Sequence, residues 1–188
     1  LSNGLVSAPM YDGAMFLAYL VLIPALGLFM TAIETSFFEN SRRLLDSIEG
    51  KAPLARLEGL AGALEKQTYL TIYEVLLTLG ALCALASLLS PSAVSWVGLR
   101  FEQLGILRLG ILAAFFQFMF LACSSIVLFL DRQAEYLALQ LFFLASQVLF
   151  TLISIYLGPQ YFGFGHLVAC ALSAVLSMDI LQRTLRRI

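Results

Sequence analysis

Charged residues are scarce in this chain and nearly absent from its longest apolar stretches. Only 12% of the 188 residues are Asp, Glu, Lys or Arg, whereas 61% are hydrophobic; a soluble domain has about 25% charged residues. The charges gather between five apolar blocks, at residues 14–33, 69–89, 106–130, 134–157 and 167–181. A helix needs about 20 mostly apolar residues to cross a bilayer, and charge at its centre is costly. The sequence therefore predicts an all-α, polytopic transmembrane helix bundle with about five spans.

Cysteine and histidine are also rare, which argues against several kinds of site. Cys83, Cys123 and Cys170 lie in three different blocks without Cys-x-x-Cys spacing, so neither a disulfide framework nor a metal site is expected. His166 follows an aromatic stretch that resembles an interfacial belt, and no carboxylate is near it in the sequence to complete a triad. The chain has no Gly-rich phosphate loop. We expect no catalytic residue, no cofactor and no nucleic-acid partner.

Basic residues are distributed unequally between the two sides that five alternating spans would define. The segment 34–68, the turn at Asp131 and the C-terminus share one side, which carries nine of the 11 Lys and Arg residues. The other side carries only Arg100 and Arg108. An excess of Lys and Arg marks the cytoplasmic face of a membrane protein. The C-terminus is therefore predicted to be cytoplasmic.

The segments between spans contain helix breakers and one amphipathic pattern. Gly50 and Pro53 interrupt the segment 34–68, and the sequence Ser90-Pro91-Ser92 predicts a turn after the second span. Four leucines then recur at helical spacing after Pro53: Leu54, Leu57, Leu60 and Leu64. This pattern predicts a helix that either lies on the membrane surface or packs on the bundle in solvent.

A few charged residues lie at or near the cytoplasmic ends of the predicted spans: Glu34, Glu74, Asp131, Asp179 and Arg183. Asp179 and Arg183 are four residues apart on one helix face, which favours an ion pair. The alternative is that Asp179 is a coupling carboxylate that faces a cavity. None of these residues lies deep in a span, so the sequence gives little support to a proton relay.

Uncharged polar residues interrupt the middle of the third and fourth spans: Gln117, Ser146, Gln147 and Thr151. They either bond to neighbouring helices or line a hydrated cavity that offers donors and acceptors to sugar hydroxyls. We treat them as candidates for a substrate path. In the first span, Pro24 and Gly27 are hinge candidates because proline removes a backbone hydrogen bond and usually kinks the helix.

Three stretches resemble a known family: Leu22–Phe29 running into Glu34–Glu39, Leu128–Arg132, and Leu157–Gly158 with Tyr161–Gly165. Their order and spacing are similar to those of the PelG family of inner-membrane exopolysaccharide transporters, within the MOP flippase superfamily. The chain departs from the family pattern at 145–147, where Asn is usual, and at Leu130, where Phe is usual.

The resemblance implies a complete protein of about twelve spans, built as two lobes. This chain, which starts at Leu1 rather than Met, is then expected to be a fragment that supplies the last five spans, most of the second lobe. The implied function is the export of an amino-sugar-rich Pel-type polysaccharide across the inner membrane into a biofilm matrix. A cytoplasmic glycosyltransferase and membrane proteins of the Pel system are the implied partners, with the segment 34–68 as a docking surface.

Two other functions stay open at this point. The chain could be a scaffold that anchors a polysaccharide synthase complex without transporting anything. It could also be an integral-membrane acyltransferase, which would need a base and a nucleophile gathered at one membrane face. The predicted cytoplasmic face offers only carboxylates for that role, Glu34, Glu39, Asp131 and Asp179, and no histidine.

Overall fold

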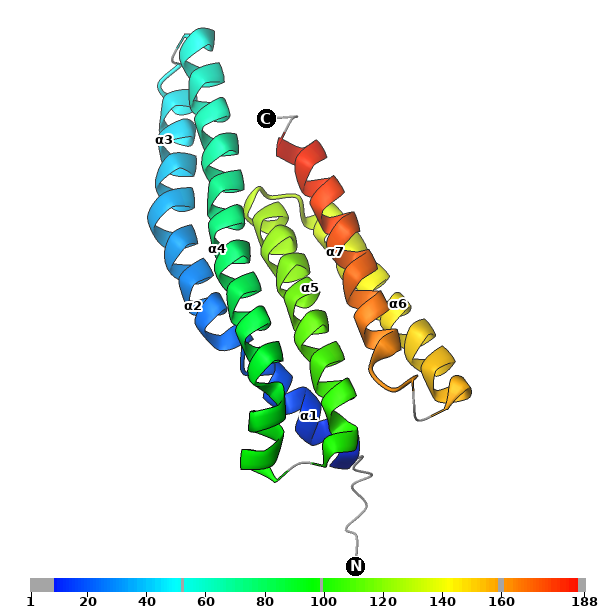
Figure 1. Ribbon diagram of the computed structural model, residues 1–188. Coiled ribbons are helices and arrows are strands. Elements are labelled where there is room, and N and C mark those ends of the chain that lie inside the picture. The colour runs from blue at the N-terminus through cyan, green and yellow to red at the C-terminus, as the bar shows by residue number, and fades with distance from the viewer. Residues whose placement is uncertain (1–8, 52, 99, 159–160, 186–188) are drawn as a thin grey trace, which may run out of the picture.

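The computed structural model describes residues 9–51, 53–98, 100–158 and 161–185, and the regular structure in these ranges is helical (Figure 1). The α-helices are α1 (Pro9–Tyr19), α2 (Leu22–Ala32), α3 (Phe38–Glu49), α4 (Leu54–Val97), α5 (Leu104–Phe129), α6 (Gln133–Leu157) and α7 (Phe164–Leu185). A π-helical turn, η1 (Ile33–Phe37), joins α2 to α3, and a 3-10 turn, η2 (Phe101–Gln103), precedes α5.

Five stretches of the described chain are long and apolar enough to cross a membrane: Tyr11–Thr35, Leu54–Val97, Leu104–Phe129, Gln133–Leu157 and Phe164–Leu185. The predicted all-α polytopic bundle with five spans is therefore confirmed. Helix α5 is the central span, since it contacts α1, α2, α4, α6 and α7. Helices α4 and α6 bury the smallest share of their surface, as expected for spans whose apolar faces meet lipid.

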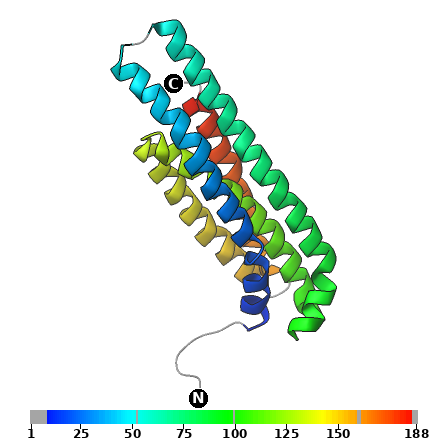
Figure 2. The same ribbon diagram turned by 90° about the vertical axis from the view of Figure 1, so that its left-hand side faces the viewer.

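The bundle has two distinct ends. At one end lie the turn after α3, the α5–α6 turn and the end of α7; at the other lie the start of α1 and the α4–α5 and α6–α7 connections (Figures 1 and 2). We call the first the hairpin end and the second the opposite end. The described parts of the segments that the sequence assigned to the more basic side lie at the hairpin end; Arg186 and Arg187, which also belong to that side, lie outside the described residues.

Helix α4 is much longer than a membrane span. Its 44 residues measure about 66 Å at about 1.5 Å per residue, roughly twice the thickness of the hydrocarbon core. It pairs with α3, and this α3–α4 hairpin projects beyond the other helices (Figure 1). The sequence placed 54–68 in a helix separate from the span at 69–89, but the two are continuous. The leucine-rich start of α4 packs against α3 as the second arm of the hairpin.

The turn predicted at Ser90-Pro91-Ser92 is not a turn, because α4 continues through Pro91 to Val97 and is capped by Gly98, whose φ is 76°. Proline has no N–H, so the carbonyl of Ser87 loses its usual partner four residues on. The Ser90 hydroxyl donates to that carbonyl at 2.7 Å. The Nε of Arg108, from α5, donates to the same hydroxyl at 3.2 Å. Side chains thus replace the missing backbone bond and the helix continues.

The first span contains an interruption at Leu20 and Val21, between α1 and α2. Pro24 leaves the carbonyl of Leu20 without its usual partner, and that carbonyl instead accepts from the Ile23 N–H at 3.3 Å. The break therefore lies four residues before the hinge candidate Pro24. Gly27 lies within α2 on an open surface, where an added Cβ would meet nothing within 4 Å.

Candidate functional site

Polar side chains from four helices meet around His166, near the start of α7. The Nδ1 of His166 lies 2.5 Å from the Gln147 amide nitrogen of α6. Its Nε2 is hydrogen-bonded to the Tyr19 hydroxyl, at the last residue of α1. One turn along α7, the Cys170 thiol donates to the Gln117 side-chain oxygen of α5 at 3.1 Å. We call His166, Tyr19, Gln147, Cys170 and Gln117 the polar cluster.

The polar cluster consists of groups that are uncharged when the imidazole is neutral. If the Gln147 amide donates to Nδ1, the Nε2–H of His166 donates to the Tyr19 oxygen, and the Gln147 side-chain oxygen is then buried without a partner. If the amide is turned over, Nδ1–H donates to that oxygen and the Tyr19 hydroxyl donates to Nε2. Both arrangements leave one amide atom unsatisfied, so the cluster has capacity to bond a further hydroxyl or amide group.

A close helix contact brings α7 onto α6 next to the cluster. The Gly165 N–H donates to the Ser154 hydroxyl at 2.9 Å. A Cβ at Gly165 would lie 2.2 Å from the backbone oxygen of Phe150 and 2.5 Å from the Ser154 hydroxyl oxygen. Only glycine allows this approach of two backbones. The contact fixes the start of α7, and with it the position of His166.

A pocket with a volume of about 240 Å³ opens beside His166. It lies between the first turns of α1 and the neighbouring ends of α6 and α7, at the opposite end of the bundle. Its lining residues are Tyr11, Thr151, Ser154, Ile155, Phe162, Gly163 and His166. Most of this wall is apolar, with the Ser154, Thr151 and His166 side chains supplying polar atoms. The arrangement offers an apolar surface with hydrogen-bonding groups at its edge.

The four candidates for a substrate path have different positions. Gln117 and Gln147 belong to the polar cluster, and Thr151 lines the pocket. Ser146 joins neither, because its hydroxyl donates to the Phe143 carbonyl of its own helix at 2.9 Å. Gln147 thus bonds to a neighbouring helix through His166, and Thr151 is the candidate that lines the pocket.

Tyr19, Ser154, His166 and Cys170 were not candidate site residues in the sequence. Two signals were present: Gln147, Thr151 and Ser154 have i, i+4, i+7 spacing, and His166 and Cys170 have i, i+4 spacing. Each pattern places its residues on one helix face. Neither shows which helix the face meets, and therefore His166 was assigned to an interfacial belt rather than to the interior.

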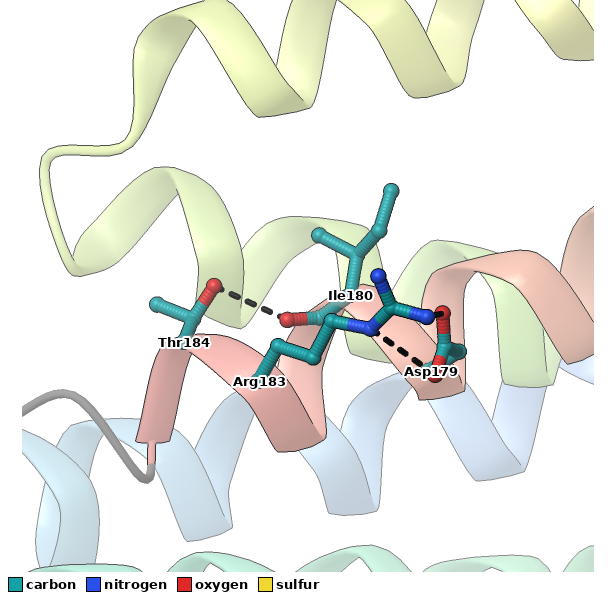
Figure 3. Close-up of polar contacts among 4 residues, drawn as sticks. All are labelled: Asp179, Ile180, Arg183 and Thr184. Carbon is teal, nitrogen blue, oxygen red and sulfur yellow. Dashed lines mark hydrogen bonds and ion pairs between the residues drawn. The ribbon is translucent and has the colours of Figure 1, made fainter.

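The charged candidates lie away from the polar cluster. Asp179 and Arg183 form an exposed pair, with Nε donating to Oδ1 at 3.1 Å and a terminal nitrogen 2.7 Å from Oδ2 (Figure 3). The neighbouring Thr184 hydroxyl donates to the Ile180 carbonyl of the same helix (Figure 3). The ion-pair interpretation of Asp179 and Arg183 therefore agrees with the structure.

The other three charged candidates are also exposed. Glu34 lies in η1 and Glu74 lies on α4, both with exposed side chains. Asp131 has a positive φ of 59° in the α5–α6 turn and accepts from the Gln133 amide at 3.0 Å. These positions suit residues in water or among headgroups rather than residues that line an internal path.

The cluster brings a thiol close to an imidazole, which raises the question of nucleophilic chemistry. The sulfur of Cys170 lies 3.6 Å from Nε2 of His166. However, Cys170 is 0% exposed and its thiol donates to Gln117. A nucleophile needs access to substrate and a base oriented by a third group. Among the described residues, His166 is bonded to a phenol and an amide, so the geometry does not favour the acyltransferase alternative. No group of three or more His, Cys, Asp or Glu side chains in the described ranges could hold a metal ion.

Five apolar spans, with uncharged polar groups gathered in the interior, define the chain as a polytopic membrane protein. The family model described as "PelG: Putative exopolysaccharide Exporter (EPS-E)" matches residues 1–188. The chain therefore belongs to the PelG family, as the sequence motifs indicated. The family description supports polysaccharide export as its function. Searches of curated proteins and of solved structures found no match.

Proposed function

We propose that this chain forms most of the second lobe of a MOP-type flippase that moves an amino-sugar-rich, Pel-type polysaccharide across the bacterial inner membrane. The observation that carries this proposal is the uncharged polar cluster beside the pocket. A sugar offers hydroxyl groups, and an N-acylated amino sugar also offers an amide; both can exchange hydrogen bonds with amide, phenol and imidazole side chains. Each exchange has a small net free energy, about 0.5–1.5 kcal/mol per bond, and weak successive contacts suit a polymer that has to move on.

The mechanism that fits this chemistry is alternating access or a polar conduit between two lobes. Gln117 and Gln147 would supply donors and acceptors on the path, Thr151 would supply a hydroxyl at the pocket, and the apolar wall would meet the faces of sugar rings. The break near Pro24 would let part of the first span change its angle. The path would be bordered by helices, whose backbone groups bond within the helix or, at Gly165, to a side chain of the next helix, as a membrane requires.

The proposal is tested by replacing the two cluster amides separately with leucine, in Gln117→Leu and Gln147→Leu. Leucine has a similar volume and suits a lipid environment, so the protein level should hold while polymer export per molecule falls. Gln140→Leu is the matched control, because Gln140 is an amide on α6 two turns before Gln147 and outside the cluster. Normal export by both cluster variants would count against a substrate path and would favour the scaffold alternative.

We further propose that the hairpin end is cytoplasmic. Its support is the excess of Lys and Arg in the segments that meet there. The measurement is a pair of reporter fusions to the intact protein, one after Leu185 and one inserted at Gly98, with reporters active only in the cytoplasm. Activity at Gly98 and none after Leu185 would reverse the orientation.

The α3–α4 hairpin is the proposed docking surface for the cytoplasmic glycosyltransferase and the membrane partners. Its support is the projection of the hairpin beyond the other spans and its exposed mixture of apolar and charged side chains, such as Leu45, Leu54 and Arg43. Site-specific photo-cross-linking from Leu45 and Leu54 should capture such partners in cells. Cross-linking that never places the hairpin near them would remove this part of the proposal.

A further inference from the structure

Helix α1 is joined to the rest of the first span by a weak connection. At the interruption, the Leu20, Val21 and Ile23 N–H groups make bonds of 3.3–3.4 Å, and two of these are i→i−3 bonds. Bonds of this length lie beyond the usual range of about 2.7–3.2 Å for backbone hydrogen bonds. Sharp changes of helix direction occur where proline interrupts the backbone ladder. The chain can therefore change the angle between α1 and α2 here at low cost.

The contact of α1 with the central helix is close and is made largely by small residues. Ala14, Ala18 and Met15 of α1 are buried, and Gly110 of α5 lies opposite Ala18 and Met15. Small side chains let helices approach closely, and they do not form the deep ridges that fix a crossing angle. Other contacts are therefore needed to fix the angle of α1 on α5.

On its other side, α1 is joined to α7 by the side-chain bond between Tyr19 and His166. The hydroxyl of Tyr19, the last residue of α1, bonds to Nε2 of His166, and Gln147 of α6 holds the other nitrogen of the ring. Tyr11, two turns earlier on α1, lines the pocket opposite Ile155 of α6. A movement of α1 about the break at Leu20 would therefore change the width of the pocket.

We infer that the Tyr19–His166 bond is a latch that holds α1 against α7 and keeps the pocket beside His166 narrow. When the bond opens, α1 turns about the Leu20–Val21 break and widens the pocket at the opposite end of the bundle. Gln147 positions the ring for the latch rather than forming it. The use of this movement in transport rests on the proposed function, but the movement itself does not.

The test measures how often α1 separates from the helices it packs against. The probe is Ala14→Cys in the intact protein in membranes, because Ala14 is fully buried against the bundle. The measurement is the rate at which this cysteine reacts with a small water-soluble thiol reagent. The parent protein without the substitution gives the background from the native cysteines. When opening and closing are fast, this rate is proportional to the open population. In the Tyr19→Phe background the rate should rise about two- to tenfold, as expected for the loss of one hydrogen bond.

Two controls separate a latch from general loosening. Tyr156→Phe removes a hydroxyl from an exposed tyrosine of α6 and should leave the Ala14→Cys rate unchanged. A probe at Ala174→Cys, fully buried where α7 packs near Phe120 of α5 and Leu139 of α6, should stay protected in the Tyr19→Phe background. An unchanged Ala14→Cys rate, or equal acceleration of both probes, would overturn the latch. The labelling needs no substrate, so it can fail while the export experiment on Gln117 and Gln147 succeeds, and the reverse.

Discussion

The two ends of the bundle use polar groups in different ways. At the hairpin end, the described ion pairs are local, within one helix or across a helix start: Glu39 with Arg43, Arg132 with Glu135, and Asp179 with Arg183. Towards the opposite end, uncharged groups bond between helices, as in the polar cluster, in the Ser154–Gly165 contact and, with one cation, at Ser90. The described ion pairs thus stay within one segment, whereas the bonds between spans involve at least one uncharged group.

This difference follows from the cost of charge in lipid. An exposed pair contributes about 0–1 kcal/mol because water competes for both partners. An uncharged interhelical bond in a membrane contributes about 0.6 kcal/mol on average. Neither is large, so the close backbone contacts should dominate the stability of the arrangement. Four predictions test this ranking, beginning with the largest expected effect.

The most damaging small substitution should be Gly165→Ala. The added Cβ would meet the Phe150 backbone oxygen at 2.2 Å, and backbone cannot move aside as a flexible side chain can. We expect a loss of about 3 kcal/mol or more in unfolding free energy, at or above the upper end for overpacking, with a sharp fall in protein level. The measurement is denaturant unfolding in detergent. Gly105→Ala is the control, since nothing lies within 4 Å of its Cβ position; equal losses would refute the close-contact argument.

Gly110→Ala should be the next most damaging change. Its Cβ would lie 2.8 Å from the Ala18 Cβ and 2.8 Å from the Met15 sulfur. Met15 can adopt another rotamer but Ala18 cannot, so we expect a loss of about 1–3 kcal/mol. Adding Ala18→Gly should recover part of this loss, which a double-mutant cycle measures as a coupling energy. Simple additivity of the two losses would show that α1 and α5 do not meet at this point.

A smaller effect is expected for Ser90→Ala, because its hydroxyl covers the Ser87 carbonyl that Pro91 leaves open. The loss should be about 1 kcal/mol in the unfolding free energy. In a Pro91→Ala background, residue 91 regains an N–H for that carbonyl, so the same Ser90→Ala change should cost less. If the cost is the same in both backgrounds, the hydroxyl does not compensate for the proline.

The smallest effect should come from the exposed pair at the end of α7. Asp179→Asn removes the charge that Arg183 meets at 2.7 Å, and we expect a change of about 0.5 kcal/mol or less in unfolding free energy. Export should also stay near normal, because the pair is local to one helix. A severe loss of export with normal protein level would instead support Asp179 as a coupling carboxylate, and would place function at the hairpin end.

The number of spans was predictable because hydrocarbon tolerates so few charges that composition alone marks the helices. Two members of the polar cluster, Gln117 and Gln147, were also predictable, since an amide in mid-span is conspicuous. His166 was not, because its importance comes from Tyr19 and Gln147, which lie 147 and 19 residues away in sequence. The continuity of α4 through Pro91 was missed for a related reason. The Ser90 hydroxyl replaces the backbone hydrogen bond that Pro91 removes, whereas a proline in the sequence predicts only an interruption of the helix.

The sequence by itself determined that this chain is a set of five membrane spans with its charge confined to their ends and connections, and its motifs pointed to an exopolysaccharide exporter family. Only the tertiary structure decided which polar side chains meet and that α3 and α4 form one projecting hairpin. It also decided that the first span is interrupted next to Tyr19, whose hydroxyl bonds to His166. The reason is physical. The free energy of transfer from water to lipid is a property of each residue separately, so the sequence alone is enough to predict which segments enter the membrane. Hydrogen bonds and close backbone contacts between helices require two partners, and their partnership exists only after the helices have packed.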